Sequence, residues 1–137
     1  MKFTLLDASV MVALFDDADV HHERYVGKLD SMGRSMFATT WPCVTEASHV
    51  LSPRNHMALL RWLQKGAAEV VGFDVSDLEF MLDWMGRYSE LRKTLMDLGD
   101  ASLVWLADKL DCTQILTEDR RDFQRYRLPD GRAFEIL

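Results

Sequence analysis

The chain has few cysteines, no long apolar segment and no leader pattern. Its two cysteines, Cys43 and Cys112, have no CxxC spacing, so we expect two reduced thiols and no disulfide. Uninterrupted apolar stretches are a handful of residues long, far below the ~20 needed to cross a bilayer. The start, MKFTLLDASV, carries one lysine and is interrupted by Asp7, which is unlike a secretory signal. These features predict a cytoplasmic protein without a membrane span.

The chain also lacks an excess of positive charge and a glycine-rich phosphate loop. It has 22 acidic and 16 basic residues, which gives a formal net charge of −6. This balance disfavours indiscriminate nucleic-acid binding, which usually depends on a basic surface. It does not exclude a nucleic-acid enzyme, because metal ions among grouped carboxylates reverse the local charge. Without a glycine-rich loop, a nucleotide-binding fold is not expected.

The composition is that of a single globular domain spanning residues 1–137. With 48% hydrophobic and 28% charged residues, the chain can bury one substantial core. Five apolar segments are predicted as strands: residues 3–6, 35–39, 68–75, 113–117 and 133–137. Helices are predicted between them: residues 7–15, a segment ended by Gly33, then 41–52, 55–66, 77–95 and 96–112. This alternation predicts an α/β fold with a parallel sheet covered on both faces.

Three residues mark helix ends in this pattern. Pro42 suits the first turn of a helix, because the N–H that proline lacks would be unpaired there. Gly66 is predicted to stop a helix, and Ser76 to cap the long helix that follows it.

Two helices are predicted to begin with nearly the same sequence, DASVMVAL from Asp7 and DASLVWLA from Asp100. An aspartate at a helix start commonly caps the helix by accepting a bond from a free N–H group. The alternative is that both carboxylates point into one shared site. Spacing alone leaves these interpretations about even, and both can hold at once.

The predicted topology places some of these acids relative to the sheet. Asp7 follows the first strand and Asp119 follows the fourth. Since ligand crevices lie at the carboxyl ends of strands in open α/β sheets, parallel strands bring both residues to one edge. Asp100, with Asp97 three residues earlier, precedes the helix that leads into the fourth strand. That position alone predicts the opposite edge from Asp119, unless the preceding segment crosses the sheet.

Glu46 lies in the helix after the second strand. On a wheel of about 100° per residue, one apolar arc contains Val44, Ala47, Val50 and Leu51. Glu46 falls just outside this arc, beside Val50. A carboxylate at such a border is costly to bury unless a cation or hydrogen-bond donors compensate, and a solvated edge is the simpler interpretation.

Four segments, in this order, resemble the PIN domain family. They are LLDASV at the start, TEASHVL after the second strand, MDLGDASLVWLA and ILTEDRRDF. The resemblance covers essentially the whole chain and points in particular to the VapC-type ribonuclease toxins of bacterial toxin–antitoxin pairs. It implies a three-layer α/β/α sandwich with a mainly parallel sheet of about five strands. It also implies that Asp100 joins the other acids, which spacing left open.

The resemblance further implies the residues of an acidic cluster. The cluster would contain Asp7, Glu46, Asp100 and Asp119 as catalytic residues, with Asp97 adjacent and Thr117 nearby. The expected metal ligands are Asp7, Asp97, Asp100 and Asp119. We assign Asp7 and Asp100 as principal ligands, Glu46 as a ligand or an activator of water, and Asp119 to a second ion. Thr117 would donate its hydroxyl or serve in strand packing.

A site of carboxylates and water suits a hard cation such as Mg²⁺ or Mn²⁺. Zinc would favour histidine or cysteine, and His21 and His22 are predicted as loop or helix-surface residues. One or two cations could orient a phosphodiester and activate water, so the predicted activity is hydrolysis of RNA. The expected partners are the RNA substrate, a cognate antitoxin protein and a second copy of the chain.

Two further features have a functional and an ordinary interpretation. Five arginines between Arg120 and Arg132 could contact phosphates, or form a solvated face with the acids among them. Trp105 lies off the apolar stripe of its helix, which suits either a subunit interface or a second packing layer.

Other enzyme classes fit less well. A haloacid-dehalogenase-like phosphatase needs a second aspartate two positions after the first, where this chain has Ser9. The acid and lysine pattern of a receiver domain is missing. Two alternatives remain open, an RNA-processing PIN nuclease without an antitoxin and a catalytically silent PIN-like binding module.

Overall fold

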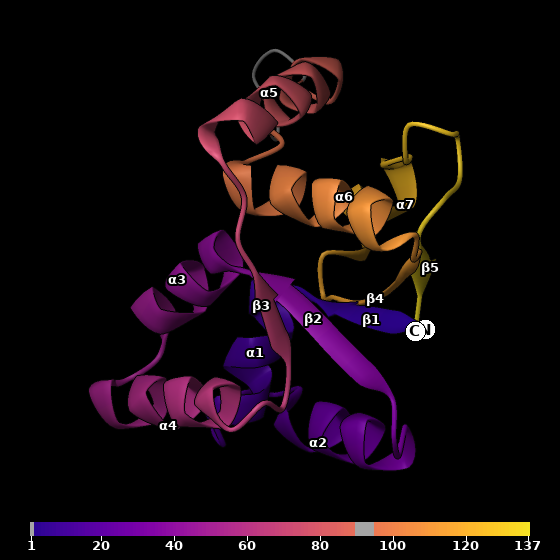
Figure 1. Cartoon of the computed structure of the whole chain (residues 1–137). Coiled ribbons are helices and arrows are strands. Elements are labelled where there is room, and N and C mark those ends of the chain that lie inside the picture. The colour runs from indigo at the N-terminus through magenta and orange to yellow at the C-terminus, as the bar shows by residue number, and fades with distance from the viewer. Residues whose placement is uncertain (1, 90–94) are drawn as a thin grey trace.

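A parallel β-sheet forms the centre of the molecule. The computed structural model describes residues 2–89 and 95–137, and within them the sheet has five strands in the order β3-β2-β1-β4-β5 (Figure 1). The strands are β1 Phe3–Leu6, β2 Met36–Thr40, β3 Glu69–Val71, β4 Gln114–Leu116 and β5 Glu135–Ile136. Every strand pair is parallel. The predicted fold class is therefore confirmed.

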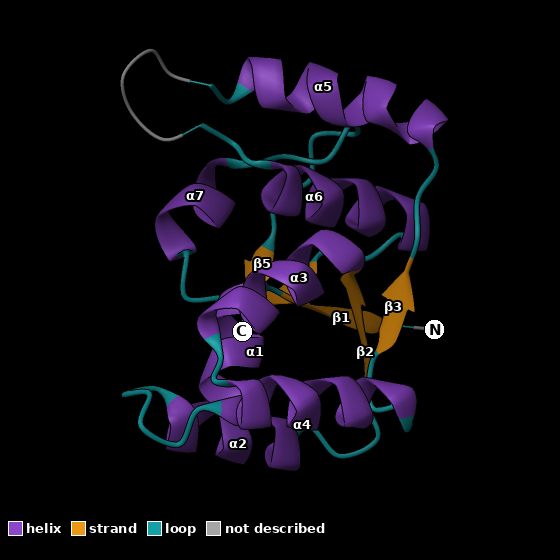
Figure 2. Ribbon diagram, turned by 90° about the vertical axis from the view of Figure 1, so that its left-hand side faces the viewer, coloured by secondary structure: helices purple, strands orange, loops and turns teal. Residues whose placement is uncertain are grey.

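Helices cover both faces of this sheet, giving three layers. They are α1 Ala8–Phe15, α2 His22–Ser31, α3 Trp41–Val50, α4 Pro53–Gln64, α5 Leu78–Arg87, α6 Leu98–Leu110 and α7 Arg120–Arg125. On one face lies α6, with α5 packed over it, and on the other lie α1, α2 and α4, while α3 lies at the end of β2 and contacts both α1 and α6 (Figures 1 and 2). None of the helices in the described residues is long and apolar enough to cross a membrane.

The register of the strands aligns their carboxyl ends. Leu5 of β1 pairs with both Ala38 of β2 and Ile115 of β4. The amide of Asp7, just beyond β1, continues this pairing by donating to the Leu116 carbonyl at 3.2 Å. The residues that directly follow β1, β2 and β4 therefore lie along one edge of the sheet.

The helix α6 is the most deeply buried helix in the core. Its residues Ala101 to Ala107 are all buried, because α6 lies between the sheet and α5. The buried hydroxyl of Ser102 bonds that of Thr40 at 2.6 Å and so ties α6 to the end of β2. Trp105 is only 7% exposed and meets Phe73 edge to face at 5.7 Å between ring centroids. The prediction of an exposed interface residue at Trp105 is wrong, and the alternative of a second packing layer is confirmed.

Several predicted boundaries need correction. The strand predicted at 68–75 is only Glu69–Val71, and the chain then forms a short 3-10 helix, Val75–Asp77. Asp74 and Asp77 form a capping box there, so Ser76 is not the cap. The following helix ends at Arg87 rather than continuing to 95, and residues 90–94 of the predicted helix lie outside the described part of the chain.

Other local predictions hold in part. Pro42 occupies the first turn of α3, as expected. Gly66 ends the α4 region with a φ of +88°, although α4 begins two residues earlier than predicted, after a Ser52 cap. Val50, predicted in the apolar arc of α3, is 66% exposed. The helix α7 was not predicted, because its charge-rich sequence RRDFQR has no apolar periodicity.

The packing of α6 predicts where the fold is sensitive to truncation. Leu103 is fully buried in α6, so Leu103→Ala should lower the free energy of unfolding by about 2–5 kcal/mol through lost burial and a residual cavity. Leu82→Ala, at a 65% exposed position on α5, should change it by less than about 0.5 kcal/mol. Urea denaturation of the two variants measures both values. Equal losses would contradict this view of the core.

Candidate active site

A pocket of about 390 Å³ lies at the carboxyl edge of the sheet, and we call it the acid pocket. It collects residues from segments far apart in the sequence. Its lining residues are Asp7, Ala8, Ser9, Val12, Asp19, His21, Glu46, Val50, Asp97, Asp100, Glu118 and Asp119. All five acids predicted for the site are among them. No lysine or arginine is among the residues that line this pocket.

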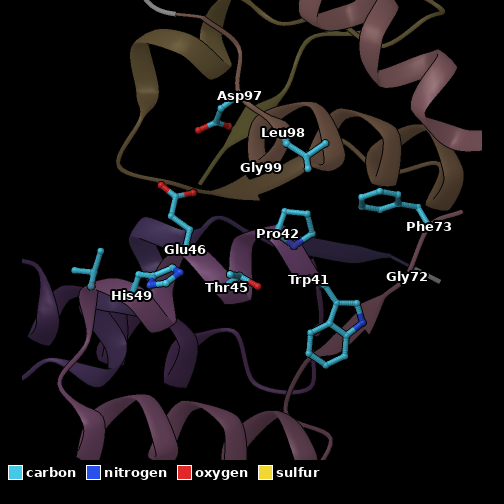
Figure 3. A pocket seen from close by; sticks show the side chains of 11 residues that line it. Trp41, Pro42, Thr45, Glu46, His49, Gly72, Phe73, Asp97, Leu98 and Gly99 are labelled. Carbon is cyan, nitrogen blue, oxygen red and sulfur yellow. The ribbon is translucent and has the colours of Figure 1, made fainter. Parts of the chain in front are cut away.

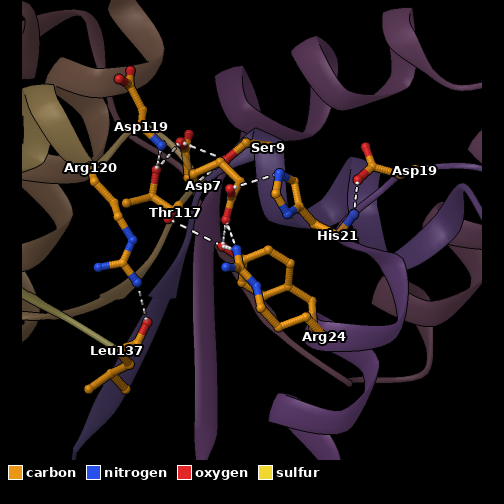
Figure 4. A network of polar contacts seen from close by, with 11 residues as sticks. Asp7, Ser9, Asp19, His21, Arg24, Thr117, Asp119, Arg120 and Leu137 are labelled. Atoms are coloured by element: carbon orange, nitrogen blue, oxygen red, sulfur yellow. Dashed lines mark hydrogen bonds and ion pairs between the residues drawn. The ribbon is translucent and has the colours of Figure 1, made fainter.

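Asp7 is held rigidly at the base of the site. Its Oδ1 accepts the backbone N–H of Ala8 at 2.8 Å at the start of α1. Its Oδ2 accepts the hydroxyls of Thr117 at 2.6 Å and Ser9 at 3.1 Å (Figure 4). Burial raises the pKa of Asp7, and these hydrogen bonds partly oppose that rise. Thr117 also accepts the Asp119 amide at 2.9 Å, so it connects two acids of the site.

The two similar DAS segments place their aspartates differently. Asp7 caps α1, whereas the cap of α6 is Asp97, whose Oδ1 accepts the Asp100 amide at 2.8 Å. Asp100 lies in the first turn of the helix, and its Oδ2 accepts the Tyr126 hydroxyl at 2.7 Å. The shared sequence therefore reflects a shared pocket, and capping explains only one of the two copies.

The topological expectation for Asp100 is wrong. The connection from α6 to β4 is short, so α6 ends near the point where β4 begins. A helix that ends at the amino edge of a parallel sheet has its own start at the carboxyl edge. Asp97 and Asp100 consequently reach the acid pocket without any segment crossing the sheet.

Glu46 approaches the same site from α3. Its side chain and that of Asp97 point toward each other from α3 and from the start of α6 (Figure 3). Gly99 permits this approach, because a Cβ at Gly99 would lie 3.3 Å from both Asp97 Oδ1 and Glu46 Oε2. Partial burial, followed by the charges of Asp97 and Asp7, raises the pKa of Glu46. Glu46 is exposed, as the solvated-edge interpretation expected, yet it faces the other carboxylates.

Asp122 is a member of the cluster that sequence reasoning missed. Carboxylate oxygens of Asp100, Asp119 and Asp122 lie within 4.8 Å of one another. Asp122 is 8% exposed and follows Asp119 by three residues at the start of α7. Residues three apart share a helix face, so a prediction of α7 would have found it. Asp7 and Asp97 line the pocket outside this close set of three.

Mutual repulsion and burial make this cluster electrostatically unfavourable without a cation. Burial, the largest cause, together with the charges of Asp97, Asp7 and Asp119, raises the pKa of Asp100 to about 8. Burial and then Asp122 raise the pKa of Asp119 to about 6. The pKa values are raised because no lysine or arginine lines the pocket to compensate these carboxylates. A hard divalent cation, which prefers oxygen ligands, would supply that charge.

Glu118 is next to Asp119, but its negative charge is compensated by neighbouring side chains at the mouth of the pocket. It pairs with Arg24, accepts the Tyr25 hydroxyl, and lies 3.0 Å from His21 Nε2 (Figure 4). Burial, and then the hydrogen bond to Glu118, raises the pKa of Tyr25 to about 12. The negative charge that remains in the pocket is therefore concentrated on the aspartates and Glu46.

The arginines that follow Asp119 form hydrogen bonds and ion pairs mainly with residues of the carboxy-terminal part of the chain. Arg132 pairs with Asp130 and Asp111, at 2.8 and 2.7 Å. Arg127 donates to the main-chain carbonyls of Gln124, in α7, and of Tyr126, just after it. Arg120 makes one long bond of 3.4 Å to the Leu137 carbonyl. The interpretation as a charged outer face accounts for Arg127 and Arg132.

These features define a class of protein. A parallel α/β/α sandwich with carboxylates from β1, α3, α6 and the end of β4 at one edge is the arrangement expected of a PIN domain. Residues 4–128 match the profile of the PIN domain family. The chain belongs to this family.

Individual relatives agree with this assignment over most or nearly all of the chain. The chain is 28% identical over 137 residues to ribonuclease VapC26 of Mycobacterium tuberculosis, covering 97% of this chain and 98% of that protein. VapC20 of Mycobacterium tuberculosis, a sarcin–ricin-loop-cleaving toxin, superposes with a TM-score of 0.70 at 17% identity, covering 87% of this chain and 92% of that chain. VapBC2 from Rickettsia felis, solved bound to a DNA fragment from their promoter, gives 0.68 at 13% identity, covering 98% of each chain. The two structural matches establish a shared fold.

The raised pKa of Asp100 predicts how stability depends on pH. The folded state holds this proton more tightly than the unfolded state, so the stabilisation is complete below the unfolded pKa and is lost as pH rises through about 8. Asp119, with a pKa of about 6, acts in the same direction at lower pH. In EDTA, the melting temperature of the wild type should therefore decrease as the pH rises from about 5 to about 9. The melting temperature of Asp100→Asn should decrease less steeply over the same range.

Asp108→Asn, at an exposed position of the same helix, is the matched control and should follow the wild type. Thermal melts across this range give the three slopes. A melting temperature that rises with pH, or identical slopes for Asp100→Asn and the wild type, would contradict the assigned repulsion.

Proposed function

We propose that the chain is a metal-dependent ribonuclease that hydrolyses RNA phosphodiester bonds in the acid pocket. The convergence of Asp100, Asp119 and Asp122 within 4.8 Å, with Asp7, Asp97 and Glu46 around them, carries this proposal. Membership of the PIN domain family and the full-length similarity to a protein named a ribonuclease support it.

The donor set fits Mg²⁺ or Mn²⁺, because it consists of carboxylate oxygens without cysteine or a histidine cluster. We assign Asp100, Asp119 and Asp122 as the residues that hold the cation, with Asp7 and Asp97 completing the charge. When bound, such a cation supplies activation of water and stabilisation of charge on the phosphate and the leaving oxygen.

The remaining residues orient these groups. The Tyr126 hydroxyl holds Asp100, and Thr117 holds Asp7, so neither carboxylate can rotate freely. Glu46 is an exposed acid of the pocket outside the close set of Asp100, Asp119 and Asp122, and we assign it to take the proton of the attacking water. Water attacks phosphorus in line, the bond to the leaving oxygen breaks, and no covalent enzyme intermediate forms.

The wild-type chain should cleave single-stranded RNA only when Mg²⁺ or Mn²⁺ is present. Asp7→Asn and Asp100→Asn should each reduce cleavage at least about 100-fold while remaining folded, because each removes charge from the cation site. Asp108→Asn, an exposed acid at the other end of α6, should retain full activity. Cleavage of a labelled RNA followed on gels, with and without EDTA, gives these rates.

A thermal-shift titration separates loss of the cation from loss of chemistry. Metal that binds only the folded state raises the melting temperature of the wild type, and Asp100→Asn should respond less. Activity in excess EDTA, or wild-type cleavage by both active-site variants, would refute the proposal.

We further propose that the chain is the toxin of a type II toxin–antitoxin pair and acts in the cytoplasm. The similarity to VapC26 and to the VapC20 and VapBC2 structures supports this role. A partner segment with arginine suits the acid pocket, because a guanidinium binds carboxylates through two parallel hydrogen bonds. We also propose a homodimer, whose interface has to use residues other than the buried Trp105.

Induced expression of the wild type alone should arrest growth of its native host. Asp7→Asn should not arrest growth, and co-expression of a small protein encoded by a neighbouring gene should restore growth to the wild-type strain. Growth curves and viable counts measure the effect. If the wild type and Asp7→Asn grow alike while the purified enzyme still cleaves RNA, a processing nuclease without an antitoxin is the better description.

A further inference from the structure

A second, larger pocket of about 770 Å³ adjoins the acid pocket, and we call it the apolar pocket. It lies between α3, the start of α6 and the chain just after β3 (Figure 3). Glu46 and Asp97 line both pockets, so the two share a wall. A molecule that occupies the acid pocket can therefore extend directly into the apolar pocket.

The walls of the apolar pocket are suited to a flat, uncharged ring. Trp41, the first residue of α3, is 54% exposed and presents its indole at one end (Figure 3). Pro42 and Phe73 supply further ring surfaces, and Phe73 is fixed by its edge-to-face contact with Trp105. Bases of single-stranded RNA stack on such aromatic side chains with little dependence on sequence.

The charge of the pocket selects which part of a nucleotide it can accept. Its charged lining residues are Glu46 and Asp97, and the residues that line it include no lysine or arginine. A phosphate or an acidic peptide is therefore repelled, whereas an uncharged base is not. The phosphate belongs in the acid pocket, where a cation compensates its charge.

Polar groups on α3 can contact the edge of a base. Thr45 and His49 line the pocket one turn apart, and both are exposed. Within the described residues, neither side chain has a hydrogen-bond partner. Their hydroxyl and imidazole groups supply a donor and an acceptor beside the aromatic surface.

We propose that the apolar pocket is a nucleobase subsite, which binds by stacking on Trp41 one base of the RNA strand whose phosphate lies in the acid pocket. This inference rests on the proposed ribonuclease function. It makes Trp41 a substrate-binding residue that acts through the strand adjacent to the cleaved bond, and it gives the acidic chain a means of holding RNA that does not depend on a basic surface.

The test is a cycle that changes the protein and the RNA together. Single-stranded oligoribonucleotides cleaved by the wild type are selected from a degenerate pool, and KM and kcat are measured for the wild type, Trp41→Ala and Trp41→Phe. Trp41→Ala should raise KM about 5- to 150-fold, the usual range for loss of one stacked base, with little change in kcat. Trp41→Phe should restore most of the affinity. Leu82→Ala, which removes an exposed apolar side chain outside both pockets, should have no effect.

The same oligonucleotides are then made with one abasic position at a time. At the position that occupies the pocket, loss of the base should raise the KM of the wild type. It should leave the KM of Trp41→Ala unchanged, because the substitution and the abasic site remove the same stacking contact. Replacement of that base by 2-aminopurine should give fluorescence that is quenched by the wild type and less quenched by Trp41→Ala.

The possible results separate the two proposals. If Asp100→Asn abolishes cleavage but Trp41→Ala leaves KM and the abasic profile unchanged, the subsite is refuted and the ribonuclease function stands. If no oligonucleotide is cleaved by the wild type, the proposed function fails and the subsite fails with it. If Trp41→Ala converts a dimer to a monomer by light scattering and shows no dependence on any base, the pocket is an interface between two copies and the inference is overturned. Loss of inhibition by the antitoxin with unchanged KM would also overturn it.

Discussion

Several carboxylates that repel one another are held together at one edge of the sheet, and the surrounding structure has to keep them there. Asp7, Glu46, Asp97, Asp100 and Asp119 all line the acid pocket, and a carboxylate oxygen of Asp122 lies within 4.8 Å of those of Asp100 and Asp119. Asp7 and Asp100 are held by the uncharged hydroxyls of Thr117 and Tyr126. Among the ion pairs of the described residues, a positive charge lies near only the outer acid of this set, Asp122, at 3.9 Å from Arg125. The repulsion is therefore left for protons or a cation to relieve.

The folded chain keeps the acids together because its core resists rearrangement. The helix α6, which presents Asp97 and Asp100, is buried on nearly all sides between the sheet and α5. Tyr126, which holds Asp100, is 2% exposed and packs edge to face against Phe123 and Tyr88. The favourable free energy of this apolar burial offsets the electrostatic cost of the site, so that an unfavourable arrangement of charges persists until a ligand binds.

The distribution of charge also explains how an acidic protein can act on a polyanion. Arg24 pairs with Glu118 at the pocket mouth and so limits the negative field there. The remaining charge is concentrated where a cation and then a phosphate would bind. Beside it, the surface around Trp41 is apolar, which allows contact with bases in place of phosphates. Binding to RNA would then depend on a cation and on stacking, and the net charge of −6 would act against unspecific association.

Much of the molecule follows from local sequence patterns. The alternation of apolar strands and helical segments predicted the α/β class, and the positions of Asp7 and Asp119 after two strands predicted a common edge. These predictions succeed because strand and helix patterns depend on periodicity, and because parallel strands necessarily align their carboxyl ends. The order of the four motifs was sufficient to indicate the PIN domain family, which the match over residues 4–128 confirms.

Other features were decided only by the tertiary structure. The short connection from α6 to β4 sets the direction of α6, but only the packing of α6 against the sheet brings Asp97 and Asp100 into the same pocket as Glu46 from α3. Asp122 joins the cluster because α7 turns it inward, although its sequence has the composition of a solvated segment. Trp105 is buried and packs edge to face against Phe73, while Trp41 stays exposed beside the site. Periodicity tells which face of an element is apolar, but which neighbour covers that face depends on how distant segments pack.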